Sequence, residues 1–284
     1  MATIRESIEH WRAAFVGAGV DSPRLTAELL LARVLEVDRG RLLALTQEPL
    51  APAHAAALHE LARRRLRREP LAYILGEREF FSRTFSVRPG VLVPRPETET
   101  IIELAKRLLP PGQAGWAADV GTGSGCLAVT LALEFPALHV LALDLEPVPV
   151  RVAADNARRH GVQARVRCCR GNLLAPVRPG AGLALLVCNP PYIDPAAEAD
   201  LPPEVSTHEP RTALFSGEHG LQAGRTVLQQ ARAVLAPGAW LLMEFGADQG
   251  PALAKTAALL GYEADLHRDL SGMERVLAAR WTSH

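Results

Sequence analysis

The sequence has few lysines and lacks both a charge excess and a long apolar run. The 31 Lys+Arg balance the 31 Asp+Glu, so the formal net charge is +0. That balance argues against a protein whose main affinity comes from neutralising many phosphates. No stretch approaches the ~18 apolar residues that a membrane span needs, and the polar first fifteen residues lack the apolar core of a signal peptide. We therefore expect a cytoplasmic protein.

Cysteine is also scarce. Cys126, Cys168, Cys169 and Cys188 lie in apolar or strand-like segments. None shows C-x-x-C or Cys/His metal spacing, which argues against a disulfide framework and against a zinc site. We expect all of them to be buried free thiols, as suits a reducing cytosol.

What is present is a large apolar fraction, 48% of 284 residues. This allows a sizeable core, and the length suggests roughly two domains at ~150 residues each. Residues 1–75 read as a helical domain, 76–95 as a β-hairpin linker with Pro89-Gly90 between its extended halves, and 96–284 as an α/β domain. Within the first, Ser22-Pro23 predicts a helix start with a capping serine, and a further helix is expected over 53–68.

The end of that further helix is rich in arginine. Five arginines lie within residues 63–68. One interpretation is a solvated face that complements the carboxyl end of the helix. The other is a patch for a negatively charged partner such as RNA.

Strands and helices alternate beyond residue 110, which predicts a parallel, doubly wound sheet. We expect seven strands and four helices between or beside them. The strands are placed at 116–120, 139–143, 164–168, 183–188, 239–245, 262–266 and 276–280, and the helices at 124–135, 148–160, 221–235 and 249–260.

The tetrapeptide Asn189-Pro190-Pro191-Tyr192 follows the apolar run 183–188. Prolines cannot extend a sheet, so the chain leaves it here with free carbonyls, at the strand end where open α/β sheets bind ligands. The Asn189 oxygen and a backbone carbonyl can accept both hydrogens of a planar –NH2 group, and the Tyr192 ring can cover that plane. The alternative is a simple strand-ending turn.

A glycine-rich loop follows the first strand of the sheet. It runs Asp119-Val120-Gly121-Thr122-Gly123-Ser124-Gly125, with G-x-G-x-G spacing. Glycine lets the backbone approach a ligand without a Cβ in the way. Asp144, at the end of the next strand, can accept two hydrogen bonds from a ribose diol. Together they predict a nucleoside cofactor. Residues 189–192, which we call the clamp because they can hold an –NH2 group, are expected beside it, and this combination indicates S-adenosylmethionine.

These motifs resemble the N5-glutamine methyltransferases that modify peptide chain release factors. The resemblance covers essentially the whole chain. It includes, besides the glycine loop and Asn-Pro-Pro-Tyr-Ile, Glu-Phe-Phe at 79–81, Val-Pro-Arg-Pro-Glu-Thr-Glu at 93–99, Glu-Pro-Arg-Thr-Ala-Leu at 209–214, and Asp-Leu-Ser-Gly at 269–272 with Arg275.

The resemblance implies a Rossmann-like, seven-stranded class I methyltransferase sheet joined by a hairpin to a small helical domain that recognises the substrate. It implies methyl transfer to the glutamine of a Gly-Gly-Gln loop in release factors, with S-adenosylhomocysteine as product. By position, residues 119 and 121–125 would line the methionine end of the cofactor, Asp144 would hold its ribose, and Asn172 with Leu173 would lie at the adenine. The family usually has an acidic residue in place of Asn172. Residues 189–192 would bind the glutamine, with Asn189, Pro190 and Tyr192 catalytic and Asn189 also beside the cofactor.

Three alternatives remain from the residues themselves. Adenine N6 and cytosine N4 are also planar amino groups, so a nucleic-acid methyltransferase could use the same clamp. An enzyme that methylates a glutamine of a ribosomal protein could use it too. The third is a cofactor-binding interaction module without catalysis.

Overall fold

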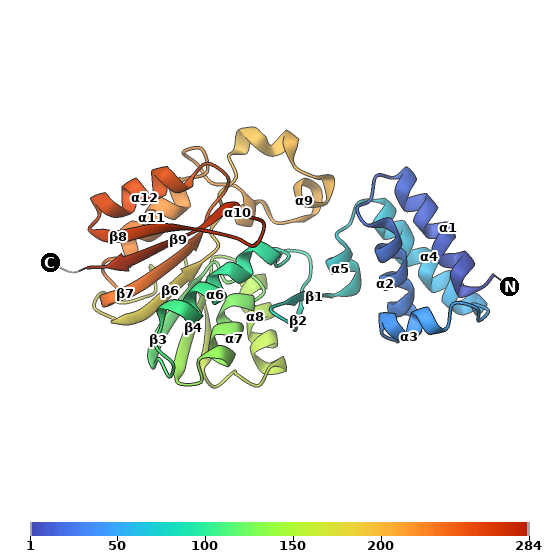
Figure 1. Cartoon of the computed structure of the whole chain (residues 1–284), viewed down its shortest axis with the longest axis horizontal. Helices are drawn as coiled ribbons and strands as arrows, with labels where there is room; N and C mark the ends of the chain where they lie inside the picture. The colour runs from blue at the N-terminus through green and yellow to red at the C-terminus, as the bar shows by residue number, and fades with distance from the viewer. Residues whose placement is uncertain (1, 283–284) are drawn as a thin grey trace. The chain divides into compact units, whose positions relative to one another are not determined.

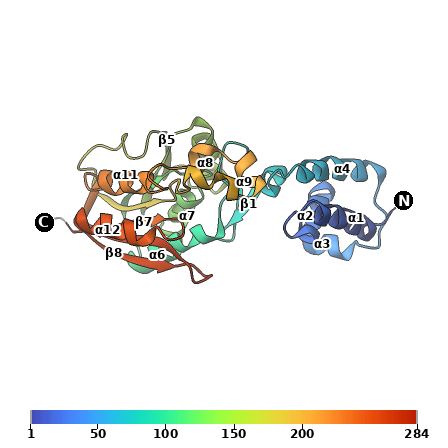
Figure 2. The ribbon, with the colours of Figure 1, turned by 90° about the horizontal axis from the view of Figure 1, so that it is seen from above.

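The computed structural model describes residues 2–282, and these form two compact units. One contains the chain up to Gly76 together with Pro202–His208, and the other contains Glu77–Leu201 and the chain from Glu209 onward. Figures 1 and 2 show the elements of each unit. No helix within residues 2–282 combines the length and apolarity needed to cross a membrane.

The first unit is helical. Its helices are α1 Ile4–Gly17, α2 Pro23–Leu35, α3 Arg39–Ala44, α4 Pro52–Leu66, α5 Leu71–Leu75 and α9 Pro203–His208. Helices α1–α5 contribute to a core that includes Phe15, Leu30 and Leu58, whereas α9 has no buried residue. Figure 2 shows α4 along one side of the group formed by α1, α2 and α3.

The start of α2 differs from the sequence prediction. Ser22 has a left-handed φ of 47° and its side chain makes no capping hydrogen bond. Pro23, at the first helical position, sets the start of the helix instead, because its fixed φ suits that position and its missing N–H would be unsatisfied there anyway.

A short antiparallel hairpin opens the second unit. Strands β1 Glu77–Phe80 and β2 Arg83–Ser86 pair through Phe80 and Arg83. The turn lies at Phe81 and Ser82, with φ of 50° and 57°, as a tight two-residue hairpin requires. The hairpin turn therefore lies before Pro89-Gly90, which was expected between the two extended halves. Pro89-Gly90 forms a separate turn, in which the Val91 N–H donates to the Arg88 carbonyl at 3.1 Å. The Glu99 carboxylate, which accepts a hydrogen bond of 2.8 Å from the Phe81 N–H, supports the hairpin turn from outside the hairpin.

A seven-stranded sheet with order β5-β4-β3-β6-β7-β9-β8 forms the centre of the second unit, and only β9 runs antiparallel to its neighbours. This confirms the predicted fold class. The strands are β3 Gly115–Val120, β4 Leu138–Asp144, β5 Val166–Arg170, β6 Leu183–Cys188, β7 Leu235–Glu244, β8 Tyr262–Arg268 and β9 Glu274–Trp281. The order reverses between β3 and β6, so a crevice is expected at their carboxyl ends.

Helices cover both faces of this sheet (Figure 1). Helices α6 Glu99–Leu108, α7 Cys126–Glu134 and α8 Pro147–Arg159 contribute to one apolar cluster, and α11 Gln222–Ala231 and α12 Gly250–Leu259 to the other. The segment after β6 contains three short helical turns, a 3-10 helix at Pro195–Asp200, α9, and α10 Arg211–Leu214.

The cysteines are all free, as expected, but they are not all buried. Cys126 and Cys188 are buried, Cys168 is half-buried and Cys169 is exposed. Cys168 and Cys169 differ from the other two because they lie on β5, which is an edge strand of the sheet. Within residues 2–282 no group of His, Cys, Asp or Glu side chains could hold a metal ion.

Candidate active site

A cavity of about 550 Å³ opens at the carboxyl ends of β3, β4 and β6. Several of the residues predicted for cofactor and substrate meet there, whereas the others are not on its lining: Asp119, Thr122, Ser124, Gly125, Pro190 and Tyr192. Its lining includes Gly121, Gly123, Asp144, Asn172, Leu173, Asn189 and Pro191, together with residues of the segment 210–217.

The glycine loop forms one wall of the cavity. Gly121, Gly123 and Gly125 have φ of 73°, 57° and 79°, in the left-handed region that favours glycine. A Cβ on Gly125 would lie 2.9 Å from the Cα of Ala153, so this glycine also lets α8 approach the loop. Asn156 holds the loop from the same helix, donating a 2.8 Å hydrogen bond to the Ser124 carbonyl.

Asp119 shapes this loop from beneath. It is fully buried, and its Oδ2 accepts hydrogen bonds from Thr122 Oγ1 at 2.6 Å and from the Ala128 N–H at 3.0 Å. Its Oδ1 has no hydrogen-bond partner among residues 2–282. Burial raises the pKa of Asp119 to about 7. Asp119 is not among the residues that line the cavity, so its visible contribution is to fix the loop.

Asp144 connects the loop to the end of β4. Its Oδ2 accepts a 3.0 Å hydrogen bond from the Gly123 N–H, and its Oδ1 accepts one of 3.1 Å from the Glu146 N–H. Burial raises its pKa, and the carboxylate borders the cavity. Each oxygen keeps acceptor capacity for a ribose hydroxyl.

The residues around this cavity fit a nucleoside cofactor. Two glycines of the glycine loop, Gly121 and Gly123, line it without Cβ atoms. The Asp144 carboxylate stands at its rim, and Asn172 with the apolar Leu173 lies on the same lining.

Asn189 lies against the glycine loop. A Cβ on Gly121 would lie 3.8 Å from the Asn189 carbonyl oxygen. The Asn189 side chain donates through Nδ2 to Thr98 Oγ1 at 3.0 Å, while the residue borders the cavity. Pro190 is buried and Pro191 half-buried.

Tyr192 takes a different position from the one expected for a ring that covers a substrate in the same cavity. It borders a neighbouring cavity of about 480 Å³, beside Gly246 and Gln249. Its hydroxyl donates to Glu244 Oε1 at 3.2 Å, and its carbonyl accepts a 2.8 Å hydrogen bond from Gln249 Nε2. Burial raises the pKa of the Tyr192 phenol.

Sequence reasoning missed Thr98 and Glu244, which join these two clamp residues. Thr98 Oγ1 donates to Glu244 Oε2 at 2.6 Å, and both residues are buried. Thr98 belongs to the motif at 93–99, but nothing in its spacing indicated a contact with residues 189 and 244. The only signal for Glu244 was a carboxylate at the end of an otherwise apolar strand.

Two motifs quoted only for the resemblance meet beside the cavity. Arg95 Nη2 donates to both oxygens of Glu209, each at 2.8 Å, and Glu209 is buried. This ion pair fixes the start of the segment 210–217, which lines the cavity.

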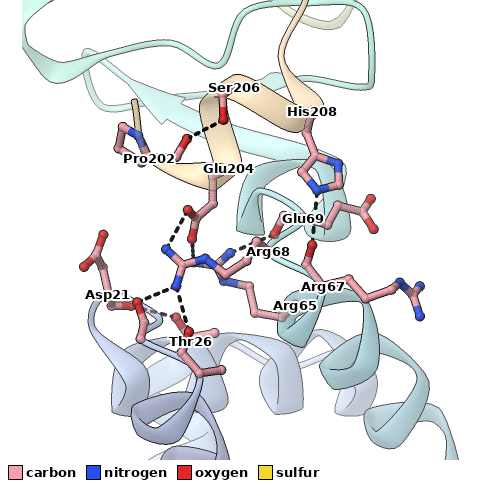
Figure 3. Close-up of polar contacts among 12 residues, drawn as sticks. Asp21, Thr26, Arg65, Arg67, Arg68, Glu69, Pro202, Glu204, Ser206 and His208 are labelled. Atoms are coloured by element: carbon pink, nitrogen blue, oxygen red, sulfur yellow. Dashed lines mark hydrogen bonds and ion pairs between the residues drawn. The ribbon is translucent and has the colours of Figure 1, made fainter. Parts of the chain in front are cut away.

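The arginine-rich end of α4 belongs to the first unit (Figure 3). Arg65 Nη2 and Arg68 Nη2 donate to Glu204 of α9, at 2.8 and 2.7 Å, and Figure 3 shows Arg67 directed away from that carboxylate. Arg63 and Arg67 are exposed, as the interpretation of a solvated face expects. That interpretation was wrong for Arg65, which is only 5% exposed. The Glu204 carboxylate, far away in the sequence, neutralises Arg65 and Arg68.

We expect Glu204→Ala to destabilise this unit. The substitution would leave the buried Arg65 guanidinium without its carboxylate, and breaking a buried pair on one side costs about 3 kcal/mol of unfolding free energy. Glu198→Ala is the matched control, because its pair with Arg211 is exposed and should contribute less than about 1 kcal/mol. Calorimetric unfolding of both variants measures the difference, and equal effects would contradict the assignment.

Comparison with known proteins places these features in a family. The family described as PrmC N-terminal domain matches residues 6–76, and the methyltransferase small domain matches 99–204. A release factor glutamine methyltransferase of Nitratidesulfovibrio vulgaris is 41% identical over 282 residues, covering 98% of this chain and 95% of the relative. One of Moorella thermoacetica is 42% identical over 259 residues, covering 91% of each chain.

Solved structures agree on the fold. A methyltransferase from Pyrococcus furiosus aligns with a TM-score of 0.55 at 18% identity, covering 72% of this chain and 91% of that one. At such identity the likeness concerns the fold alone. The sequence relatives, with their identities above 40% over nearly the whole chain, show the family. The chain belongs to the release factor glutamine methyltransferase family.

Proposed function

We propose that this protein transfers the methyl group of S-adenosylmethionine to the side-chain amide nitrogen of the glutamine in the Gly-Gly-Gln motif of peptide chain release factors. The observation that carries the proposal is Asn189 at the edge of the cavity that Gly121, Gly123 and Asp144 also line, with its Nδ2 already engaged by Thr98. The relatives' names supply the class of substrate.

The chemical difficulty lies in the substrate. An amide nitrogen is a poor nucleophile because its lone pair is delocalised into the carbonyl. When bound, S-adenosylmethionine supplies an electrophilic methyl group. The task of the protein is therefore to hold the nitrogen in the reactive orientation, and such orientation contributes up to ~7–11 kcal/mol.

The clamp meets this need with two acceptors. Because Asn189 Nδ2 donates to Thr98, Asn189 Oδ1 is left to accept one N–H of the substrate amide. The Pro190 carbonyl accepts the other. Both oxygens also stabilise the positive charge that builds on nitrogen during transfer, so no strong general base is required. Tyr192, anchored to Glu244 and Gln249, supports the far side of the clamp.

Each part of the chain has a role in this proposal. Residues 1–75 recognise the release factor, 76–95 connect the two domains, and 96–284 bind the cofactor and carry out the transfer. Asp119 and residues 121–125 form the cofactor loop, and the nucleoside of the cofactor is bound by Asp144, Asn172 and Leu173. The balanced charge of the chain supports a protein substrate rather than DNA or RNA. Since release factors work on ribosomes, we expect the protein to act in the cytoplasm.

Methyl transfer from labelled S-adenosylmethionine tests this function. The purified protein is offered a release factor, its Gly-Gly-Gln→Gly-Gly-Ala variant, ribosomal proteins and DNA, and mass spectrometry locates the label. We expect label on the unaltered release factor alone, at that glutamine. Label on DNA or on a ribosomal protein would assign the clamp to another substrate, and no label despite cofactor binding would contradict the proposal.

A further inference from the structure

A chain of three hydrogen bonds, which we call the relay, lies beneath the clamp. Asn189 Nδ2 donates to Thr98 Oγ1 at 3.0 Å, and Thr98 Oγ1 donates to Glu244 Oε2 at 2.6 Å. The other oxygen of Glu244 accepts from the Tyr192 hydroxyl at 3.2 Å. One carboxylate at the end of β7 is thus connected to both clamp side chains, which belong to the loop after β6.

We propose that Glu244 and Thr98 are positioning residues that select which end of the Asn189 amide faces the substrate. This inference rests on the proposed function and adds to it why the oxygen of the Asn189 amide, rather than its nitrogen, faces the substrate. Neither residue touches the substrate in this account. Both act through Asn189 and Tyr192.

The selection follows from counting protons. A threonine hydroxyl has one hydrogen, and next to an ionised carboxylate that hydrogen points at the carboxylate. The Thr98 oxygen can then only accept from Asn189, so it must meet the Nδ2 side of the amide. Asn189 Oδ1 is thereby turned to the opposite side, as an acceptor for a substrate N–H. A flipped amide would present two N–H donors to a substrate that is itself a donor.

The burial of Glu244 points the same way. Glu244 is 1% exposed and Thr98 is 3% exposed. The hydrogen-bond partners of Glu244 among residues 2–282 are two neutral hydroxyls, those of Thr98 and Tyr192. A buried carboxylate without a hydrogen-bonded cation is costly to folding. An apolar side chain would avoid that cost, but it would lack the two acceptor oxygens that Thr98 and Tyr192 contact.

Protonation of Glu244 would abolish the selection. Burial raises the pKa of Glu244 to about 7. Once protonated, the carboxyl group can donate to Thr98 Oγ1, which frees the Thr98 hydrogen to donate to Asn189 Oδ1. Turnover should therefore fall as pH decreases through about 7. The titratable groups that face Glu244 are Glu97, Arg275, Tyr192, Cys126 and Cys188.

The first test compares Thr98→Val with Thr98→Ser on release factor methylation. Valine keeps the shape but removes the acceptor, so we expect kcat to fall by about 10²-fold, the effect of a misplaced clamp, with cofactor Kd close to the parent value. The melting temperature should also fall, because Glu244 and Asn189 each lose a hydrogen-bond partner. Serine keeps the hydroxyl and should retain most of the turnover. Unchanged kcat in the valine variant would overturn the relay, as would equal losses of kcat and cofactor affinity.

Glu244→Gln supplies a second test that survives if Thr98→Val fails to fold. Its amide oxygen still accepts from Thr98 but cannot be protonated near neutrality. We expect the decline of kcat below pH of about 7 to disappear in this variant. Persistence of the same decline would overturn the relay.

A third readout does not depend on activity. The Asn189 side-chain amide gives NMR signals that are identified by their loss in Asn189→Ala. In the parent protein they should shift as pH passes through about 7, and Thr98→Val should remove that shift. Signals insensitive to pH would overturn the relay even if the substrate were not a release factor. Failure of release factor methylation with pH-sensitive signals would instead contradict the proposed function alone.

Discussion

Replacement of Asn189 by alanine should lower kcat by ~10²–10³ while cofactor binding barely changes. The substitution removes one of the two acceptors that hold the substrate amide, and losing one such charge-stabilising hydrogen bond costs about 2.7–4 kcal/mol in the transition state. Asn189 borders the cavity, but its side-chain bond is to Thr98 rather than to the glycine loop. Single-turnover kinetics at saturating cofactor, with calorimetric measurement of cofactor Kd, separates the two effects.

The pattern of losses decides the role of Asn189. A fall in kcat alone assigns it to the substrate. Equal losses in cofactor affinity and turnover would contradict the clamp and place Asn189 with the cofactor loop instead.

Asp144→Ala should show the opposite pattern. A charge-assisted hydrogen bond contributes about 1.5–3 kcal/mol, so the loss of one to the ribose should raise cofactor Kd by roughly tenfold to 150-fold. The substitution also releases the Gly123 N–H from its acceptor, which loosens the glycine loop in the same direction. Turnover at saturating cofactor should remain near the parent value.

Asp144→Asn is the matched control for this prediction. Its amide oxygen retains one neutral acceptor in the same place, so its Kd should lie between those of the parent and the alanine variant. An unchanged Kd in Asp144→Ala would show that the ribose is held elsewhere.

The fold was predictable because its signals are local. Apolar runs at 116–120 and 139–143, each followed by a helical pattern, and the apolar run at 183–188 indicate buried parallel strands, and all seven predicted strands are present. In such a sheet the carboxyl ends of neighbouring strands lie together, so the glycine loop, Asp144 and Asn189 were expected at one edge. They line one cavity.

The remaining features depend on contacts between distant residues. Thr98 and Glu244 meet across 146 positions, and Arg65 meets Glu204 across 139. The hairpin turn at Phe81 and Ser82 is supported by Glu99 rather than by turn residues. No local pattern encodes these partners, so a polar residue that looks exposed in the sequence can be buried by a carboxylate from elsewhere in the fold.

The most direct test of the account is a crystal structure of the protein with S-adenosylhomocysteine and a Gly-Gly-Gln peptide. We expect the glutamine Nε2 within about 2.8–3.1 Å of Asn189 Oδ1 and of the Pro190 carbonyl, with Asn189 Nδ2 still donating to Thr98. A glutamine bound away from these oxygens would contradict the proposed clamp, as would an Asn189 amide whose Oδ1 faces Thr98 and whose Nδ2 faces the substrate.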